Sequence, residues 1–221
     1  MNRESRKEKF RKVDLYPVTC ERLSVGRSNF DLLEAAIRGG AKIVQLREKE
    51  LGTRDLFGMA LAFRKRTAEA GMLLIINDRI DIALAVDADG VHLGQEDLPL
   101  AAARRIASEL LIGVSTHSRE EALQAQEGGA DYVNIGPIFP TRTKEGVTRF
   151  LGPEAILGIA AGLEIPFTVM GGINGGNIGK VVSQGARRVA VVTAVTMADD
   201  MAGAVTSLRE AIRSSRAVFP P

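Results

Sequence analysis

The chain has 221 residues, of which 45% are hydrophobic and 25% are charged, and a net charge of +2. This composition suits one globular domain with a sizeable core, while the small net charge and the absence of Trp argue against a nucleic-acid partner. Cys20 is the only cysteine, which excludes an intramolecular disulfide and a cysteine-rich zinc site. We expect a cytoplasmic protein without a membrane span, because cysteine usage suits a reducing compartment and no apolar run reaches ~18 residues.

Residues 1–12 are polar and of mixed charge, without the apolar core of a signal peptide. We predict that they form an N-terminal extension, either mobile or folded as a partial helix. At the other end, residues 217–221 are predicted to be a short C-terminal tail. The folded domain is therefore expected to span 13–216.

Strand-like and helix-like segments alternate between these ends. Eight short runs rich in Val, Ile or Leu are typical of strands buried on both faces. These runs are 13–19, 42–46, 72–76, 90–93, 110–114, 131–135, 166–170 and 187–192. Segments with helical periodicity lie at 29–38, 54–69, 80–86, 99–108, 119–127, 153–161, 176–183 and 199–213. This alternation predicts a parallel sheet with right-handed crossovers.

A weak internal repeat marks three helix-to-strand joints. Gly-Gly-Ala at 39–41 and 128–130 and Gln-Gly-Ala at 184–186 each precede a predicted strand, as expected where a left-handed glycine ends a helix. Eight units in this chain average about 28 residues each, which is the size of a compact β/α unit. We therefore favour an α/β fold, a single-domain (β/α)8 TIM barrel. An open doubly wound sheet remains the structural alternative, because strand count alone does not show closure.

The predicted strands end, one after another, at polar residues that could bind phosphate, metal or a polar ring. In a barrel, the carboxyl ends of all strands meet at one face, where catalytic loops lie. Gly171-Gly172 follows the seventh run, and the eighth runs into Val192-Thr193. Phosphate commonly binds after strands seven and eight, where glycine lets backbone N–H groups approach an anion. We therefore predict a phosphate-bearing ligand at this position.

The loop 136–144 follows the sixth run and carries a second cluster of polar groups. Two prolines and a glycine constrain its backbone, and Thr141, Thr143 and Lys144 lie within four residues. Such groups are suited to holding a heteroaromatic ring and an oxyanion together. The alternative is a solvated surface loop.

Asp78 and Asp97 follow consecutive predicted strands, so both can reach one position above the barrel mouth. Either residue alone could be a helix cap. Together, and opposite Arg47, Lys49 and Lys144, they are suited to a diphosphate bound with Mg²⁺.

The two histidines, His92 and His117, also follow strands. Two histidines do not define a zinc centre by spacing, and Ser115 lacks the surroundings of a nucleophile elbow. Hydrolase chemistry is therefore disfavoured. We interpret His117 as a structural residue and His92 as polar lining of the pocket.

The order and spacing of these motifs closely resemble those of the thiamine phosphate synthase family over about 15–197. The motifs are Gln-Leu-Arg-Glu-Lys at 45–49, Ile-Asn-Asp-Arg at 76–79, and the segments 89–97, 113–117, 136–144 and 171–173. The resemblance implies a TIM-barrel transferase of thiamine biosynthesis. Such an enzyme joins 4-amino-2-methyl-5-(diphosphooxymethyl)pyrimidine to a thiazole (carboxylate) phosphate, giving thiamine phosphate and diphosphate.

The resemblance also implies roles for individual residues. The pyrimidine diphosphate would be bound by Gln45, Leu46, Arg47, Glu48, Lys49, Asn77, Ser115 and Lys144. The thiazole phosphate would be bound by Thr141, Arg142, Thr143, Gly172, Val192 and Thr193. Mg²⁺ would be held by Asp78 and Asp97, and the catalytic groups would be Arg47, Lys49, Ser115 and Lys144. We hypothesise a metal-assisted dissociative displacement with small-molecule substrates only, while formation of a homo-oligomer stays open.

Three positions depart from the family pattern: Cys20 where Asp is frequent, Asn134 where a small residue is usual, and Thr193 where Ser is usual. Thr193 keeps the hydroxyl and the N–H, whereas Cys20 leaves the first strand without a role. A thiazole tautomerase is the nearest rival function, but that related barrel tends to lose the Asn-Asp pair, the second metal acid and the Thr-x-Thr-Lys loop. A non-catalytic barrel that binds phosphate metabolites is the second alternative.

Overall fold

Eight parallel strands form one sheet in the computed structural model, which describes the backbone of residues 1–141, 143 and 149–218. Their spatial order is β1-β8-β7-β6-β5-β4-β3-β2, so each strand except the two at the ends lies beside its neighbours in sequence. The strands are β1 (Leu15–Pro17), β2 (Ile43–Leu46), β3 (Leu73–Asn77), β4 (Gly90–Leu93), β5 (Leu111–Thr116), β6 (Tyr132–Ile135), β7 (Phe167–Val169) and β8 (Val189–Val191). All eight predicted strands are therefore confirmed.

The sheet closes on itself between its first and second strands. Val18, just after β1, forms a parallel bridge with Gln45 in β2. The amide N–H of Thr19 also donates to the carbonyl of Gln45 at 2.9 Å. The predicted (β/α)8 barrel is thus confirmed, and the open doubly wound sheet is excluded.

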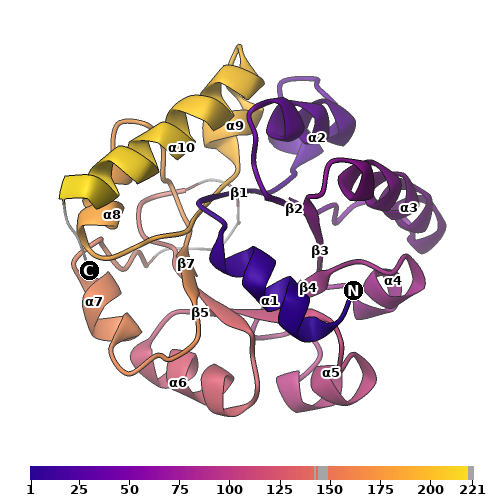
Figure 1. Ribbon diagram of the computed structural model, residues 1–221, viewed down its shortest axis with the longest axis horizontal. Helices are drawn as coiled ribbons and strands as arrows, with labels where there is room; N and C mark the ends of the chain where they lie inside the picture. Colours follow the sequence, from indigo (N-terminus) through magenta and orange to yellow (C-terminus); the bar gives the residue numbers. More distant parts are fainter. Residues whose placement is uncertain (142, 144–148, 219–221) are drawn as a thin grey trace.

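Helices surround the closed sheet, as the ring of ribbons in Figure 1 shows. The outer helices are α2 (Asn29–Arg38), α3 (Thr53–Glu69), α4 (Ile80–Ala85), α5 (Leu100–Ile106), α6 (Arg119–Glu127), α7 (Ala155–Ala160), α8 (Ile178–Ser183) and α10 (Met201–Val218). Their starts follow local sequence signals: Ser28 and Asp31 form a reciprocal capping box at α2, and Ser118 caps α6. Two short helices, η1 (Glu21–Leu23) and α9 (Thr193–Thr196), follow β1 and β8 and were not predicted.

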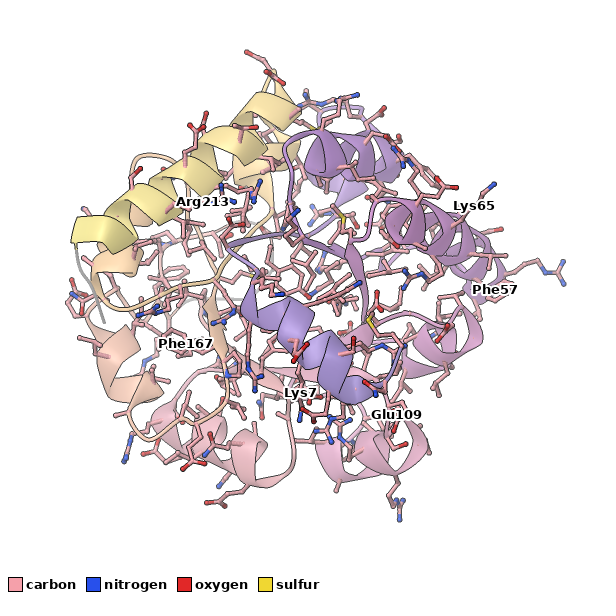
Figure 2. The ribbon with its side chains drawn as sticks, in the orientation of Figure 1. Lys7, Phe57, Lys65, Glu109, Phe167 and Arg213 are labelled. Atoms are coloured by element: carbon pink, nitrogen blue, oxygen red, sulfur yellow. The ribbon has the colours of Figure 1, made fainter. Side chains whose placement is uncertain are left out.

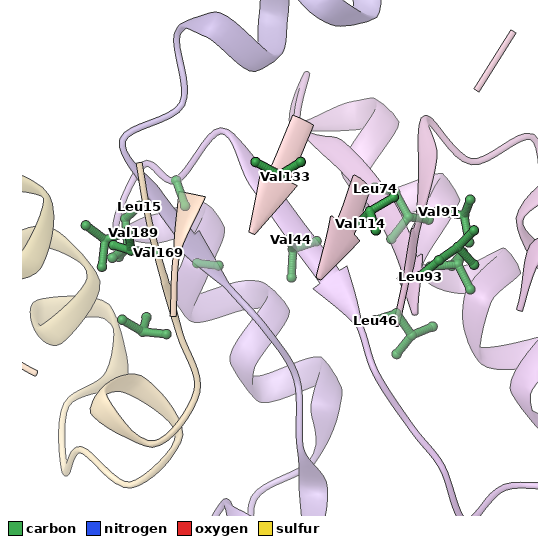
Figure 3. Close-up of a cluster of buried hydrophobic side chains, with 14 of the residues drawn as sticks. Leu15, Val44, Leu46, Leu74, Val91, Leu93, Val114, Val133, Val169 and Val189 are labelled. Carbon is green, nitrogen blue, oxygen red and sulfur yellow. The ribbon is translucent and has the colours of Figure 1, made fainter. Parts of the chain in front are cut away.

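The strands separate two apolar regions because successive side chains point to opposite faces. An outer core fills the space between the sheet and the helices. Strand residues of this core, including Val44, Leu74 and Val133, are labelled in Figure 3. An inner core fills the barrel itself and includes Tyr16, Ile75 and Tyr132. The outer core packs the helices against the sheet. The inner core fills the barrel below the carboxyl ends of its strands.

Residues of the expected N-terminal extension form α1 (Arg3–Arg11), which lies across one end of the barrel (Figure 1). Arg3 Nε lies 2.8 Å from Asp131, and Arg6 Nε lies 3.5 Å from Asp89. These two acids directly precede β6 and β4, so α1 covers the amino ends of the strands, opposite the face where catalytic loops are expected. Figure 2 shows the α1 side chain of Lys7 at this end of the barrel.

No helix in the described part of the chain is long and apolar enough to span a membrane.

Candidate active site

Asp78, which follows β3, turns its backbone into the left-handed region, with φ of 61°. Asp adopts this conformation more readily than most residues. The Asp78 N–H donates to the carbonyl of His92 at 2.8 Å, which ties the turn to β4. In the next loop, Asp97 Oδ2 accepts a hydrogen bond from the Gly94 N–H at 2.6 Å. Two carboxylates are thus brought together from consecutive loops.

The electrostatics of this pair favour a bound cation. Burial raises the pKa of Asp78, the nearby Asp97 carboxyl raises it further, and Lys49 acts in the opposite direction. Lys49 Nζ lies 3.1 Å from Asp78 Oδ2. Among the described residues, no third His, Cys, Asp or Glu completes a metal cluster. Two carboxylates with open positions for substrate oxygens and water are a suitable donor set for Mg²⁺.

Arg47 is held in place by the end of the first strand. Its N–H donates to Thr19 Oγ1 at 2.8 Å, and the same hydroxyl donates back to the Arg47 carbonyl at 3.1 Å. The guanidinium Nη1 lies 3.8 Å from the buried Cys20 thiol. The first strand, to which the sequence assigns no role, therefore supports a cation at the mouth.

Ser115 in β5 connects the mouth to the barrel interior. Its Oγ lies 3.0 Å from His92 Nε2, and its carbonyl accepts a hydrogen bond from Gln95 Nε2. Burial lowers the pKa of His92 to about 4, although the charge of Asp97 acts to raise it. His92 is therefore neutral near neutral pH.

The loops after β6 and β7 pack directly against each other. The Phe139 N–H donates to the Gly171 carbonyl at 3.0 Å. Gly172 has φ of 62°, and a Cβ there would collide with Pro140 and Phe139. Glycine is therefore required at 172 both for its backbone conformation and for this close approach.

The hydroxyls of Thr141 and Thr143 in the β6 loop lie 3.1 Å apart. The Thr143 N–H donates to Thr141 Oγ1 at 3.2 Å. Arg142 and Lys144, to which the sequence also assigns binding roles, lie outside the described residues. After β8, Val192 precedes α9, whose first residue is Thr193.

A protein-family model described as thiamine monophosphate synthase matches residues 15–195. The chain belongs to this family. Thiamine-phosphate synthase of Chloroflexus aurantiacus is 50% identical over 195 residues, covering 88% of this chain and 90% of the relative. The enzyme of the same name from Moorella thermoacetica is 45% identical over 204 residues, covering 92% and 97%. The predicted resemblance is thus confirmed.

Solved structures agree with the family assignment. Thiamine phosphate pyrophosphorylase from Pyrococcus furiosus superposes with a TM-score of 0.86 at 38% identity, covering 95% of this chain and 98% of that one. A 3-hexulose-6-phosphate synthase, at 20% identity and a TM-score of 0.64, shares the fold.

Three residues to which the family resemblance assigns substrate contacts lie in different surroundings at the barrel mouth. Asn77 ends β3, half-buried, in register with His92. The Leu46 side chain is buried in the outer core, so its backbone is the part that can face a ligand. Glu48 accepts a hydrogen bond from Asn29 Nδ2 at 3.0 Å and is thereby engaged with the start of α2.

Sequence reasoning missed two residues of this family member's interior, Tyr16 and Tyr132. Gln45 Nε2 donates to Tyr16 Oη at 2.9 Å, and the two tyrosine hydroxyls lie 3.0 Å apart. These are the only tyrosines of the chain. Their position in apolar strands, where a buried hydroxyl needs a partner, was the available signal.

Proposed function

We propose that this chain forms thiamine phosphate by joining the pyrimidine diphosphate to the thiazole phosphate, with release of diphosphate. The observation that carries the proposal is the mouth arrangement of Asp78, Asp97 and Lys49, with Arg47 on the neighbouring strand end. A diphosphate is a strongly anionic leaving group, and it needs cations on several oxygens at once. Membership of the thiamine monophosphate synthase family supports the same reaction.

Mg²⁺ would be held by Asp78 and Asp97, whose facing carboxylates and limited exposure suit a divalent cation. When bound, the metal neutralises charge on the diphosphate. Arg47 and Lys49 bind oxygens of the diphosphate. Lys144 has the same proposed role, from a part of the loop outside the described residues.

The other contacts to the pyrimidine diphosphate are assigned to the strand ends around this centre. Ser115 donates a hydrogen bond to a diphosphate oxygen, and Asn77 and Gln45 contact the pyrimidine side. Leu46 contributes its backbone, and Glu48 orders the loop through Asn29 and the Lys49 N–H.

The thiazole phosphate binds on the opposite side of the mouth, where the loops after β6, β7 and β8 meet. Its proposed ligands are Thr141, Arg142, Thr143, Gly172, Val192 and Thr193. Hydroxyls and backbone N–H groups are suited to a phosphate, and the close packing of the β6 and β7 loops supports a preformed site.

The reaction proceeds by dissociative displacement. The C–O bond to the diphosphate breaks, and its electron pair leaves with the diphosphate, where Arg47, Lys49 and Lys144 stabilise the charge. The aminopyrimidine donates electron density to the methylene cation, and the thiazole nitrogen then attacks it with its lone pair. No covalent intermediate with the protein is required.

The direct test is to mix the protein, Mg²⁺ and both substrates and to measure thiamine phosphate. We expect product from the wild type and a loss of roughly a hundredfold or more in Asp78→Ala. Asp81→Ala is the matched control, because this exposed acid lies three residues from Asp78, is paired with Arg79 and should leave turnover unchanged. Equal turnover in both variants would contradict the assignment. Aromatised thiazole phosphate without thiamine phosphate would favour a tautomerase.

A further inference from the structure

Five polar side chains form a continuous hydrogen-bonded chain across the interior of the barrel. In order, they are Gln45 of β2, Tyr16 of β1, Tyr132 of β6, His92 of β4 and Ser115 of β5. The successive distances between their polar atoms are 2.9, 3.0, 3.1 and 3.0 Å. The first four residues are buried, and half-buried Ser115, at the mouth, is the most exposed of the five.

Packing fixes Tyr132, the third of these five residues. The ring of Phe10, from α1, stacks on the ring of Tyr132 with centroids 4.3 Å apart. On β5, Gly113 lies against the same ring, and a Cβ there would overlap the Tyr132 ring and hydroxyl. Tyr132 therefore has one position, with its hydroxyl between Tyr16 and His92.

The direction of these hydrogen bonds follows from Gln45, the first of the five residues. Gln45 Nε2 can only donate, so Tyr16 Oη accepts. The proton of Tyr16 then has the Tyr132 hydroxyl as its acceptor within the part of the chain that the structure describes. In the reverse direction, the Tyr16 proton would have no acceptor among these groups although Tyr16 is only 1% exposed, which is unfavourable.

The same order fixes the tautomer of His92. Because Tyr132 accepts from Tyr16, its own proton goes to His92 Nδ1. The ring proton of neutral His92 is then on Nε2, from which it is donated to Ser115 Oγ.

We propose that His92, held as the Nε2–H tautomer, is a positioning residue that makes Ser115 a hydrogen-bond donor to the diphosphate. Since Ser115 Oγ accepts from His92 on its inner side, the hydroxyl proton is directed to the mouth. With the opposite tautomer, Ser115 would donate inward and present lone pairs to an anion. The inference rests on the proposed function in one respect, that the group receiving the proton is the pyrimidine diphosphate.

The tautomer can be read directly from ¹⁵N NMR of histidine-labelled protein. The chain has two histidines, so a His117→Gln variant assigns the signals. We expect wild-type His92 to show a protonated Nε2 and an unprotonated Nδ1. In Tyr132→Phe, which removes the donor to Nδ1, this preference should weaken. A protonated Nδ1 in the wild type would overturn the proposal.

A kinetic cycle tests whether His92 acts through Ser115. We expect His92→Phe to lower kcat roughly ten- to a hundredfold, and His92→Gln, whose amide can replace the Nε2–H donor, to recover part of the loss. The double variant His92→Phe/Ser115→Ala should be no slower than Ser115→Ala alone. Losses that multiply in the double variant would show that His92 acts independently of Ser115 and would overturn the proposal.

Thr168→Val is the matched control for disturbing the interior. It removes another buried hydrogen bond, from Thr168 Oγ1 to Asn134 Oδ1 at 2.8 Å, that lies outside the five-residue chain. We expect unchanged kcat and an unchanged His92 tautomer, whereas a loss equal to that of His92→Phe would count against the inference. If the proposed function itself were wrong, the result would be different: the wild type would form no thiamine phosphate.

Discussion

Gly113 shows how one missing side chain shapes the barrel interior. The strand pairing places it beside Tyr132, and the space that its Cβ would occupy is filled by the tyrosine ring. The position demands glycine because of this close approach and not because of a special backbone angle. Nothing in the local sequence of β5 indicates this, since the ring comes from the next strand.

Gly113→Ala should therefore destabilise the fold by overpacking, by roughly 1–3 kcal/mol in the free energy of unfolding. Urea denaturation measures this change. Gly58→Ala is a suitable control, because Gly58 lies within α3 with no atom near the place of an added Cβ. Alanine there should stabilise the protein by about 0.5–1 kcal/mol. Equal effects of the two substitutions would contradict the described contact with Tyr132.

His92 gives the protein a pH-dependent stability. Burial lowers its pKa from 6.5 to about 4 in the folded state, so between these values the unfolded state binds the additional proton. Stability due to His92 is complete above pH 6.5 and is lost as pH falls towards 4, by about 3 kcal/mol in total. Denaturation of wild type and His92→Gln across this range should show a larger loss of stability towards low pH in the wild type than in the variant. A persistent equal slope in the variant would assign it to other groups.

The helix α1 closes the amino end of the barrel with buried ion pairs. The Arg6 side chain is 4% exposed and lies 3.5 Å from Asp89, and its Nη1 donates to the Glu109 carbonyl at 2.7 Å. Asp89 in turn accepts from the Leu74 N–H in β3 at 2.9 Å. The helix therefore holds the amino ends of several strands together and also places Phe10 in the barrel interior.

Arg6→Met keeps much of the side-chain volume but removes these charged hydrogen bonds. Because Asp89 keeps Arg64 as a partner at 2.7 Å, we expect a loss of about 2 kcal/mol and not complete unfolding. Thermal denaturation is the measurement. Lys9→Met, at an exposed position of the same helix, should have little effect. If Arg6→Met were as stable as Lys9→Met, α1 would not be secured in this way.

The element pattern was readable from the sequence because apolar runs and helical periodicity are local. The predicted strand at 13–19 became the shorter β1, while the helix predicted at 199–213 extends through Val218. The short helices η1 and α9 were missed because they lack a periodic apolar face. The sequence alone does not decide whether residues 3–11 are helical or mobile, because the acids that contact Arg3 and Arg6 lie about a hundred residues away in the chain.

Closure of the barrel brings together residues that are distant in sequence. The convergence of Asp78, Lys49 and Asp97 could be predicted, because parallel strand ends meet at one face. The contacts that orient Arg47 and Ser115 could not be predicted. The contact of Cys20 with Arg47 and the hydrogen bonds that run through Tyr132 to Ser115 depend on the barrel's register. Sequence thus indicates which groups face the mouth, and the closed fold indicates how they are held.

The proposed role of the carboxylate pair, Asp78 and Asp97, is to hold the metal that assists departure of diphosphate. The most direct test is the initial rate of thiamine phosphate formation as Mg²⁺ is titrated at saturating substrates, in wild type and in Asp97→Asn. We expect a rate that requires Mg²⁺ in the wild type and a half-saturating concentration at least roughly tenfold higher in the variant. Superimposable curves for the two proteins, or full wild-type activity without divalent metal, would show that this carboxylate pair does not hold a metal needed for the reaction.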